Sequence, residues 1–161
     1  MTTKAMAIAR EGAQWAVHEI DITEMADLDS LVDAMRDLGD ETVVAFIEED
    51  DEYLAIVRVE PDEPDPKVFL SDRRVLLTSE LAERLLTDAL PSMTGLGDDV
   101  DDEGPLGQAV PVGDLDLLDD LGTPTEVLLE LLAEEGMLPA DVISAICERA
   151  GAGEIFDEVR G

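Results

Sequence analysis

The sequence predicts an α+β protein: an antiparallel sheet of ββαβββ order with helices on one face, followed by a small all-helical C-terminal region. Two observations predict the sheet. β-Branched and aromatic runs recur between residues 43 and 70, and charged or turn-forming residues separate them. A third observation predicts the helical region, because residues 114–161 read as consecutive short apolar segments with helix start and stop signals.

The predicted strands are short apolar runs with turns between them. Residues 5–9 and 15–22 flank a turn-like stretch, which predicts an opening hairpin. Residues 43–47 and 53–59 are separated by five acidic residues, a pattern typical of two central strands joined by a charged hairpin tip. A further strand is expected at 67–70, after a segment rich in proline.

Two helices are expected to accompany these strands. Between Leu28 and Leu38, apolar residues recur at the i, i+3, i+4 and i+7 spacing of an amphipathic helix. Asp27 is a suitable N-cap for it, and Gly39 lies just past its end. Residues 76–90 predict a second helix that closes the sheet domain.

The chain divides into three parts by composition. Residues 1–90 form the predicted sheet domain. Residues 91–113 contain five glycines, three prolines and five acidic residues, which predicts an acidic linker. Residues 114–161 form the predicted helical module. Because its 48 residues give only a marginal core, we expect this module to dock on the sheet domain or on a partner.

The helical module carries clear boundary signals. Asp114 can cap a helix that Gly122 ends, and residues 123–126, Thr-Pro-Thr-Glu, combine a capping box with a proline at the first helical position. Gly136 is expected to end that second helix, and Pro139 to open a third. A last short helix would use the apolar residues between 155 and 159.

The net charge of -31, from 41 acidic and ten basic residues, excludes several classes of partner. Nucleic acids and anionic lipids bind proteins through lysine and arginine, so we expect neither direct nucleic-acid binding nor membrane binding. The longest apolar runs are five residues, too short for a membrane span or a signal peptide. We therefore expect a cytoplasmic protein whose partner surface is basic or locally apolar.

No pattern of catalytic, cofactor-binding or metal-binding residues is present in the sequence. The acidic runs at 48–52 and 98–103 lack the alternation and the central glycine of a calcium loop. Cys147, the only cysteine, falls on the apolar stripe of a predicted helix, where it is most simply a core residue. His18, the only histidine, precedes Glu19 but has no third group of known position. We therefore expect a protein that is not an enzyme.

The turn between the second and third helices of the module is the candidate partner-binding site, and its residues are Glu134, Glu135, Met137 and Leu138. Met137 and Leu138 could form an exposed apolar anchor. Hydrophobic residues after a helix-ending glycine more often fold back onto the preceding turn, so both alternatives remain open here.

Several segments resemble the actinobacterial family named tRNA adenosine deaminase-associated protein. These segments are 46–51, 55–59, 68–72, 85–88, 119–123 and, most specifically, Glu134-Glu135-Gly136-Met137-Leu138-Pro139-Ala140-Asp141. The resemblance implies an association with the deaminase, and it supplies no catalytic residues. The chain is not itself the deaminase, because a single cysteine cannot supply that enzyme's Pro-Cys-x-x-Cys zinc motif.

Taken together, these features predict a non-catalytic accessory protein with a protein partner, and the resemblance points to tRNA adenosine deaminase as that partner. One alternative is a small-ligand binder or enzyme with a pocket between the sheet and its helix, in which His18 or Arg58 acts with nearby carboxylates. Another is an acidic mimic of nucleic acid, which requires one continuous carboxylate face. The sequence leaves the oligomeric state open.

Overall fold

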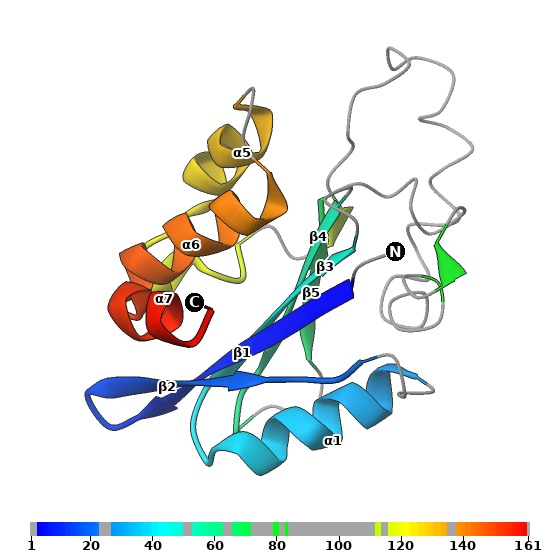
Figure 1. Cartoon of the computed structure of the whole chain (residues 1–161), viewed down its shortest axis with the longest axis vertical. Coiled ribbons are helices and arrows are strands. Elements are labelled where there is room, and N and C mark those ends of the chain that lie inside the picture. Colours follow the sequence, from blue (N-terminus) through cyan, green and yellow to red (C-terminus); the bar gives the residue numbers. More distant parts are fainter. Residues whose placement is uncertain are drawn as a thin grey trace.

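The computed structural model describes residues 3–22, 27–49, 53–62, 66–71, 79–80, 83, 112–113, 116–134 and 138–160. Its strands are β1 (Thr3–Glu11), β2 (Gln14–Glu19), β3 (Val43–Glu49), β4 (Tyr53–Val59), β5 (Lys67–Leu70) and β6 (Val112–Gly113). Its helices are α1 (Leu28–Leu38), the 3₁₀ turn η1 (Asp119–Leu121), α5 (Thr125–Ala133), α6 (Pro139–Ala150) and α7 (Gly153–Arg160). Figure 1 shows their arrangement.

The strands form one antiparallel sheet in the order β2-β1-β3-β4-β5-β6. The predicted α+β class and the ββαβββ order are confirmed, and β3 and β4 are central as expected. The predicted cap of α1 is also confirmed, because the Asp27 carboxylate accepts a hydrogen bond from the Ser30 N–H. The helix predicted over 76–90 falls almost entirely outside the described residues.

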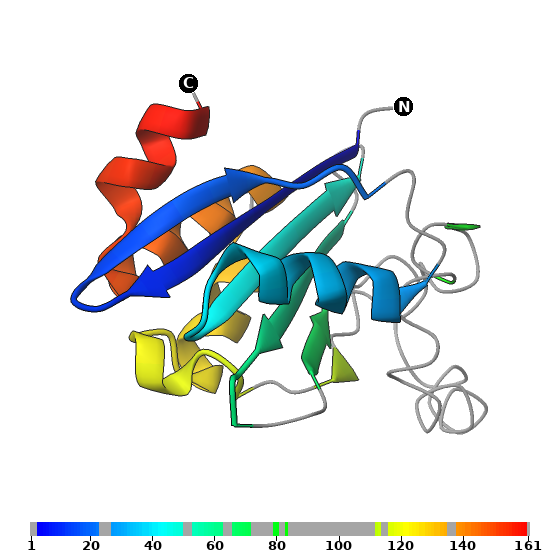
Figure 2. The same cartoon turned by 90° about the horizontal axis from the view of Figure 1, so that it is seen from below.

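Helices cover both faces of the sheet, with α1 on one face and α5, α6 and α7 on the other (Figures 1 and 2). Successive side chains of a strand point to opposite faces, so the sheet contributes to two cores. Ala45 and Val57 pack with α1, whereas Phe46 and Ile56 pack with the C-terminal helices. This double cover explains why β3 and β4 are buried at every residue.

The C-terminal helices share a core with the sheet. This core includes Trp15 of β2, Phe46 of β3 and Phe156 of α7. The rings of Phe46 and Phe156 meet edge to face, with centroids 6.5 Å apart. Cys147 is buried in the same core, which agrees with its predicted role as a core residue. The boundary near residue 91 lies outside the described residues, so the division into three parts stays a prediction.

The predicted capping box at Thr123 is wrong. Helix α5 begins at Thr125 with Pro124 at the N-cap position, and no side chain caps it. The Thr123 N–H instead bonds to the Leu118 carbonyl, 3.1 Å away, so Thr123 belongs to the preceding turn. Its hydroxyl is buried and has no hydrogen-bond partner within the described part of the chain. Two other signals were correct, since Gly122 follows η1 in a left-handed conformation and Pro139 opens α6. The helix expected before Gly122 is instead a turn followed by the three-residue η1, and the predicted boundary residues Asp114 and Gly136 lie outside the described residues.

Strand β6 occupies the end of the range predicted as linker. Gly113, at φ +101°, pairs with Phe69 of β5, and a Cβ atom on it would lie 2.2 Å from the Val68 carbonyl oxygen. Only glycine permits so close an approach. A two-residue strand leaves no apolar run in the sequence, which is why the pattern did not predict it.

Candidate protein-interaction surface

Arg58 holds the segment before α5 against the sheet. It lies on β4, on the face that the C-terminal helices cover, and its side chain is 9% exposed. Its Nη1 donates to the Leu117 carbonyl at 2.5 Å and to Asp120 Oδ1 at 2.6 Å. Its Nη2 donates to Asp120 Oδ2 at 2.8 Å and to Glu60 Oε1 at 2.9 Å, and its Nε donates to Glu60 at 3.1 Å. A guanidinium has five N–H donors, so all of them are engaged within the protein.

The same contacts set the charges of this network. The hydrogen bond to Asp120, more than the attraction of Glu60, raises the Arg58 pKa, against an opposing effect of burial. The Arg58 hydrogen bond in turn lowers the pKa of the Asp120 carboxyl. Both groups therefore stay ionised near neutral pH. A carboxyl held as its anion cannot serve as a general acid there.

A polar cleft of about 480 Å³ opens beside this network. Its charged lining consists of three basic residues, Arg10, Arg58 and Lys67, and five acidic residues, Glu41, Glu60, Asp62, Asp116 and Asp120. Arg10 and Glu41 are partly engaged, because Arg10 donates to the Gly12 carbonyl and Glu41 accepts from the Gly12 N–H. Arg58 forms part of the wall of this cleft. Because all five of its N–H groups are already engaged, it cannot donate a hydrogen bond to a ligand.

His18 and Arg58 do not come together. His18 pairs with Ala7, whose side chain belongs to the core under α1, so His18 points to that face. Arg58 points to the opposite face, beside η1. The ligand-binding alternative placed one of them in a pocket between sheet and helix, but the interface of the sheet with α1 is filled by apolar side chains.

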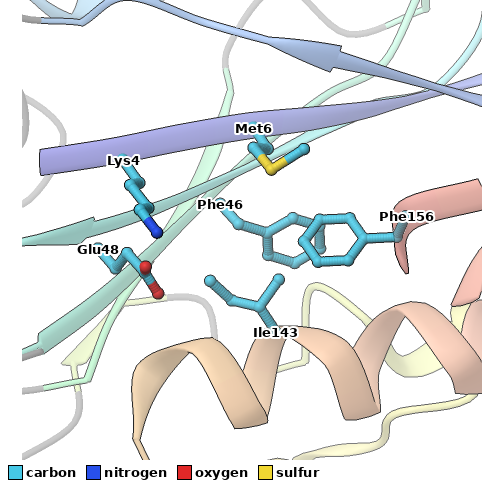
Figure 3. Close-up of a pocket in the computed structure, with 6 residues that line it drawn as sticks. All are labelled: Lys4, Met6, Phe46, Glu48, Ile143 and Phe156. Carbon is cyan, nitrogen blue, oxygen red and sulfur yellow. The ribbon is translucent and has the colours of Figure 1, made fainter. Parts of the chain in front are cut away.

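A small apolar pocket does exist on the other face of the sheet (Figure 3). The close-up shows Phe46 and Phe156 side by side with Ile143 below them and Met6 above, while Lys4 and Glu48 lie at one side. The cavity measures about 30 Å³. That volume admits one or two water molecules or a methyl group, and it is far below the several hundred Å³ of a substrate pocket.

Two of the four predicted partner-binding residues, Glu134 and Leu138, are described, one at the end of α5 and the other just before α6. Leu138 is 49% exposed, and it is the single large hydrophobic side chain in the described part of the chain that is exposed. Glu134, at the end of α5, is exposed as well. The Leu138 N–H bonds to the Asp141 carboxylate at 3.1 Å, which fixes the start of α6. Glu135 and Met137 lie outside the described residues.

Sequence reasoning missed two residues that organise this face. Asp120 accepts hydrogen bonds from Arg58, although the two residues are 62 positions apart in the sequence. The Trp15 indole N–H donates to the Ala150 carbonyl at 3.0 Å, across 135 positions. The Arg10 guanidinium also lies over the Trp15 ring, 5.5 Å from its centroid. A single tryptophan in an acidic chain was the available signal, because a buried indole N–H usually has an acceptor.

The described residues contain neither a membrane-spanning helix nor a cluster of metal ligands. No helix among them is long and apolar enough to cross a membrane. No group of three or more histidine, cysteine, aspartate or glutamate side chains among them is arranged to hold a metal ion.

Comparison with known proteins identifies the family. The profile of the Rv3753c-like tRNA adenosine deaminase-associated proteins matches residues 3–153. The chain belongs to this family. A relative, Protein Rv3753c of Mycobacterium tuberculosis (strain ATCC 25618 / H37Rv), is 26% identical over 155 residues, which cover 96% of this chain and 85% of the relative. No solved structure matches the chain. The match covers the sheet, the Arg58 network and the tip between α5 and α6, so the resemblance seen in the sequence is confirmed.

Proposed function

We propose that this protein is a non-catalytic, cytoplasmic accessory protein that binds tRNA adenosine deaminase through the tip between α5 and α6. The observation that carries the proposal is that Leu138 and Glu134 are both exposed between α5 and α6, in a family whose name records an association with that enzyme. The binding residues would be Glu134, Glu135, Met137 and Leu138.

The chemistry of this tip suits a protein partner. A fully exposed leucine gains about 1.5–3 kcal/mol when a partner buries it completely, and Leu138, which is 49% exposed, would gain about half of that, enough to contribute an anchor to an interface. The acidic residues around it contribute less to affinity than to the rate and orientation of approach. An enzyme that binds tRNA carries a basic surface, and the net charge of -31 would steer such a surface toward this protein.

Three features of the described residues favour a role without catalysis. Arg58 is fully engaged in holding η1, the Asp120 pKa is lowered and not raised, and the apolar pocket of about 30 Å³ is too small for a substrate. The polar cleft of about 480 Å³ has the volume of a ligand site, but Arg58 in its wall has no N–H group left to donate to a ligand. Catalytic groups usually have a pKa shifted toward the working pH.

Binding to the deaminase from the same organism, measured by calorimetry at physiological salt, tests the proposal. We expect micromolar or tighter binding, and we expect Leu138→Ala to weaken it about threefold to tenfold, or by about 0.7–1.4 kcal/mol. Thermal stability should change little, because Leu138 is half exposed. Glu134→Gln and Glu126→Gln form a matched pair, since each removes one exposed carboxylate from α5. Only Glu134→Gln should slow association, which stopped-flow mixing of the two proteins measures.

Two results would contradict the proposal. One is the absence of binding at micromolar concentrations, together with an unchanged rate of tRNA deamination. The other is full binding by Leu138→Ala, which would move the interface away from the tip between α5 and α6.

A further inference from the structure

The outer edge of β2 carries backbone groups that the sheet does not use. The Ile20 N–H bonds to the Ala5 carbonyl, and the Arg10 N–H bonds to the Thr42 carbonyl, which fixes the direction of each residue's backbone groups. Backbone hydrogen bonding alternates along an antiparallel strand. The backbone N–H and C=O groups of Ala16 and His18 therefore point toward β1, whereas those of Trp15, Val17 and Glu19 point outward, away from the sheet. These three residues present three N–H and three C=O groups.

None of these outward groups has a hydrogen-bond partner among the described residues. The edge also lacks the usual protection against pairing with another chain, since β2 spans six residues with no proline and no lysine. Residues 14–17 are uncharged in a chain in which 32% of residues are charged. The opposite edge differs, because β6 is only two residues long.

Helix α7 extends the helical layer past this edge. In Figure 2, α7 lies on the side of β2 away from β1, while Figure 1 shows it in the layer of α5 and α6. The helix and β2 are in contact, and Phe156 anchors α7 on the sheet. The edge of β2 and the overhanging helix therefore form a step. A strand added to β2 would bond to the outward groups and be covered by α7.

We infer that this step binds an extended, basic segment of another protein, which joins the sheet as a further strand beside β2. Backbone hydrogen bonds supply affinity in this mode of recognition, and alternate side chains supply specificity. The exposed side chains around the step are mainly acidic and set the sign of the partner's charge. They are Glu11 at the β1–β2 turn, Glu19 and Asp21 at the far end of β2, and Glu154 and Glu158 on α7, with Arg10 as the one exposed cation beside Trp15 among the described residues. Lysine or arginine at alternate positions would meet these carboxylates.

The same charges oppose a second copy of this chain as the occupant. Pairing β2 with β2 would bring together two molecules that each carry -31, and their acidic residues would converge at the two hairpins. Like charges brought close across an interface destabilise it. This inference concerns a surface other than the Leu138 tip, so it stands or falls separately from the proposed function.

Amide hydrogen exchange followed by NMR on the full chain tests the inference. The probe is a blocked peptide of alternating lysine and valine, about eight residues long, a usual strand length. Without it, the Trp15, Val17 and Glu19 amides should exchange quickly and those of Ala16 and His18 slowly. With saturating peptide, we expect the three outward amides to exchange at least about tenfold more slowly. Fluorescence of Trp15, the only tryptophan, gives a second readout.

Matched peptides identify the cause of any protection. A glutamate-valine peptide of equal length should protect much less, because it repeats the charge of the edge. A lysine-valine peptide methylated at alternate backbone nitrogens should also protect much less, because it cannot complete the ladder. Equal effects of all three peptides, or no protection by the first, would overturn the inference. So would protection that rises with the concentration of the protein alone together with dimers in sedimentation, because the occupant would then be a second copy.

Discussion

The guanidinium of Arg58 and the carboxylate of Asp120 form a two-pronged ion pair, with N–O distances of 2.6 and 2.8 Å, across 62 residues of sequence. Arg58 is buried on a strand of the sheet, whereas Asp120 is largely exposed on η1. The pair therefore ties the start of the helical module to the sheet at one point. A second tie, from Trp15 to the Ala150 carbonyl, holds the end of α6.

Arg58→Met should destabilise the fold by about 2–4 kcal/mol, because it removes five hydrogen bonds and leaves the Leu117 carbonyl without its donor. Unfolding in guanidinium chloride measures the change in the free energy of unfolding. Arg149→Met is the matched control, since exposed Arg149 donates a single bond, to the Gly122 carbonyl. The control should cost less than about 1 kcal/mol. Equal losses in the two variants would show that Arg58 does not hold the module in place.

Asp120→Asn should change how stability depends on acid. The pKa of the Asp120 carboxyl is lower in the folded chain than its ordinary value of 3.8, so its ion pair stabilises the fold above that value. The stabilisation is lost as the pH falls through the lower, folded pKa. Because Asp120 is exposed, we expect the wild-type advantage to be at most about 1 kcal/mol.

This advantage should be constant above about pH 5 and should shrink below pH 3.8. Urea unfolding of the wild type and of Asp120→Asn at a series of pH values measures this difference in the free energy of unfolding. Asp119→Asn removes an equal charge from the same turn without touching Arg58, and it should give a smaller advantage at neutral pH. An advantage that grows toward low pH would have the wrong sign and would contradict the assignment.

Gly122→Ala should cost more than Gly151→Ala, although both glycines have left-handed backbones, at φ +95° and +90°. A Cβ atom on Gly122 would lie 2.7 Å from the Arg149 carbonyl oxygen, whereas nothing lies within 4 Å of one on Gly151. Both variants carry about 1–2 kcal/mol of backbone strain, and only Gly122→Ala must also move α6. Thermal unfolding of the two variants compares them. Equal melting temperatures would mean that η1 and α6 are not in close contact.

Thr123→Val should be neutral or should stabilise the fold by up to about 1 kcal/mol, because the buried Thr123 hydroxyl has no hydrogen-bond partner. The capping-box pattern predicts the opposite, a loss of about 1 kcal/mol. Denaturant unfolding distinguishes the two outcomes. A clear loss of stability would mean that the hydroxyl is hydrogen-bonded after all.

The sequence by itself determined the features that depend on neighbouring residues. Alternating and continuous apolar runs marked β3 and β4, and the 3.6-residue period marked α1 with its cap at Asp27. Gly122 and Pro139 marked helix boundaries, because glycine readily adopts the left-handed conformation that ends a helix, whereas the fixed φ of proline suits the first turn of one. The exposed tip was identified only as a candidate, since no local pattern decides whether Leu138 folds back.

Only the tertiary structure decided which face of the sheet each helix covers and which distant groups meet. Asp120 has several acidic neighbours in sequence, and nothing local distinguishes it as the partner of Arg58. Thr123 matches a cap by sequence, yet the preceding turn uses its N–H and leaves its hydroxyl unpaired. Such outcomes depend on the packing of residues far apart in the chain, and a pattern that spans a few residues carries no information about them.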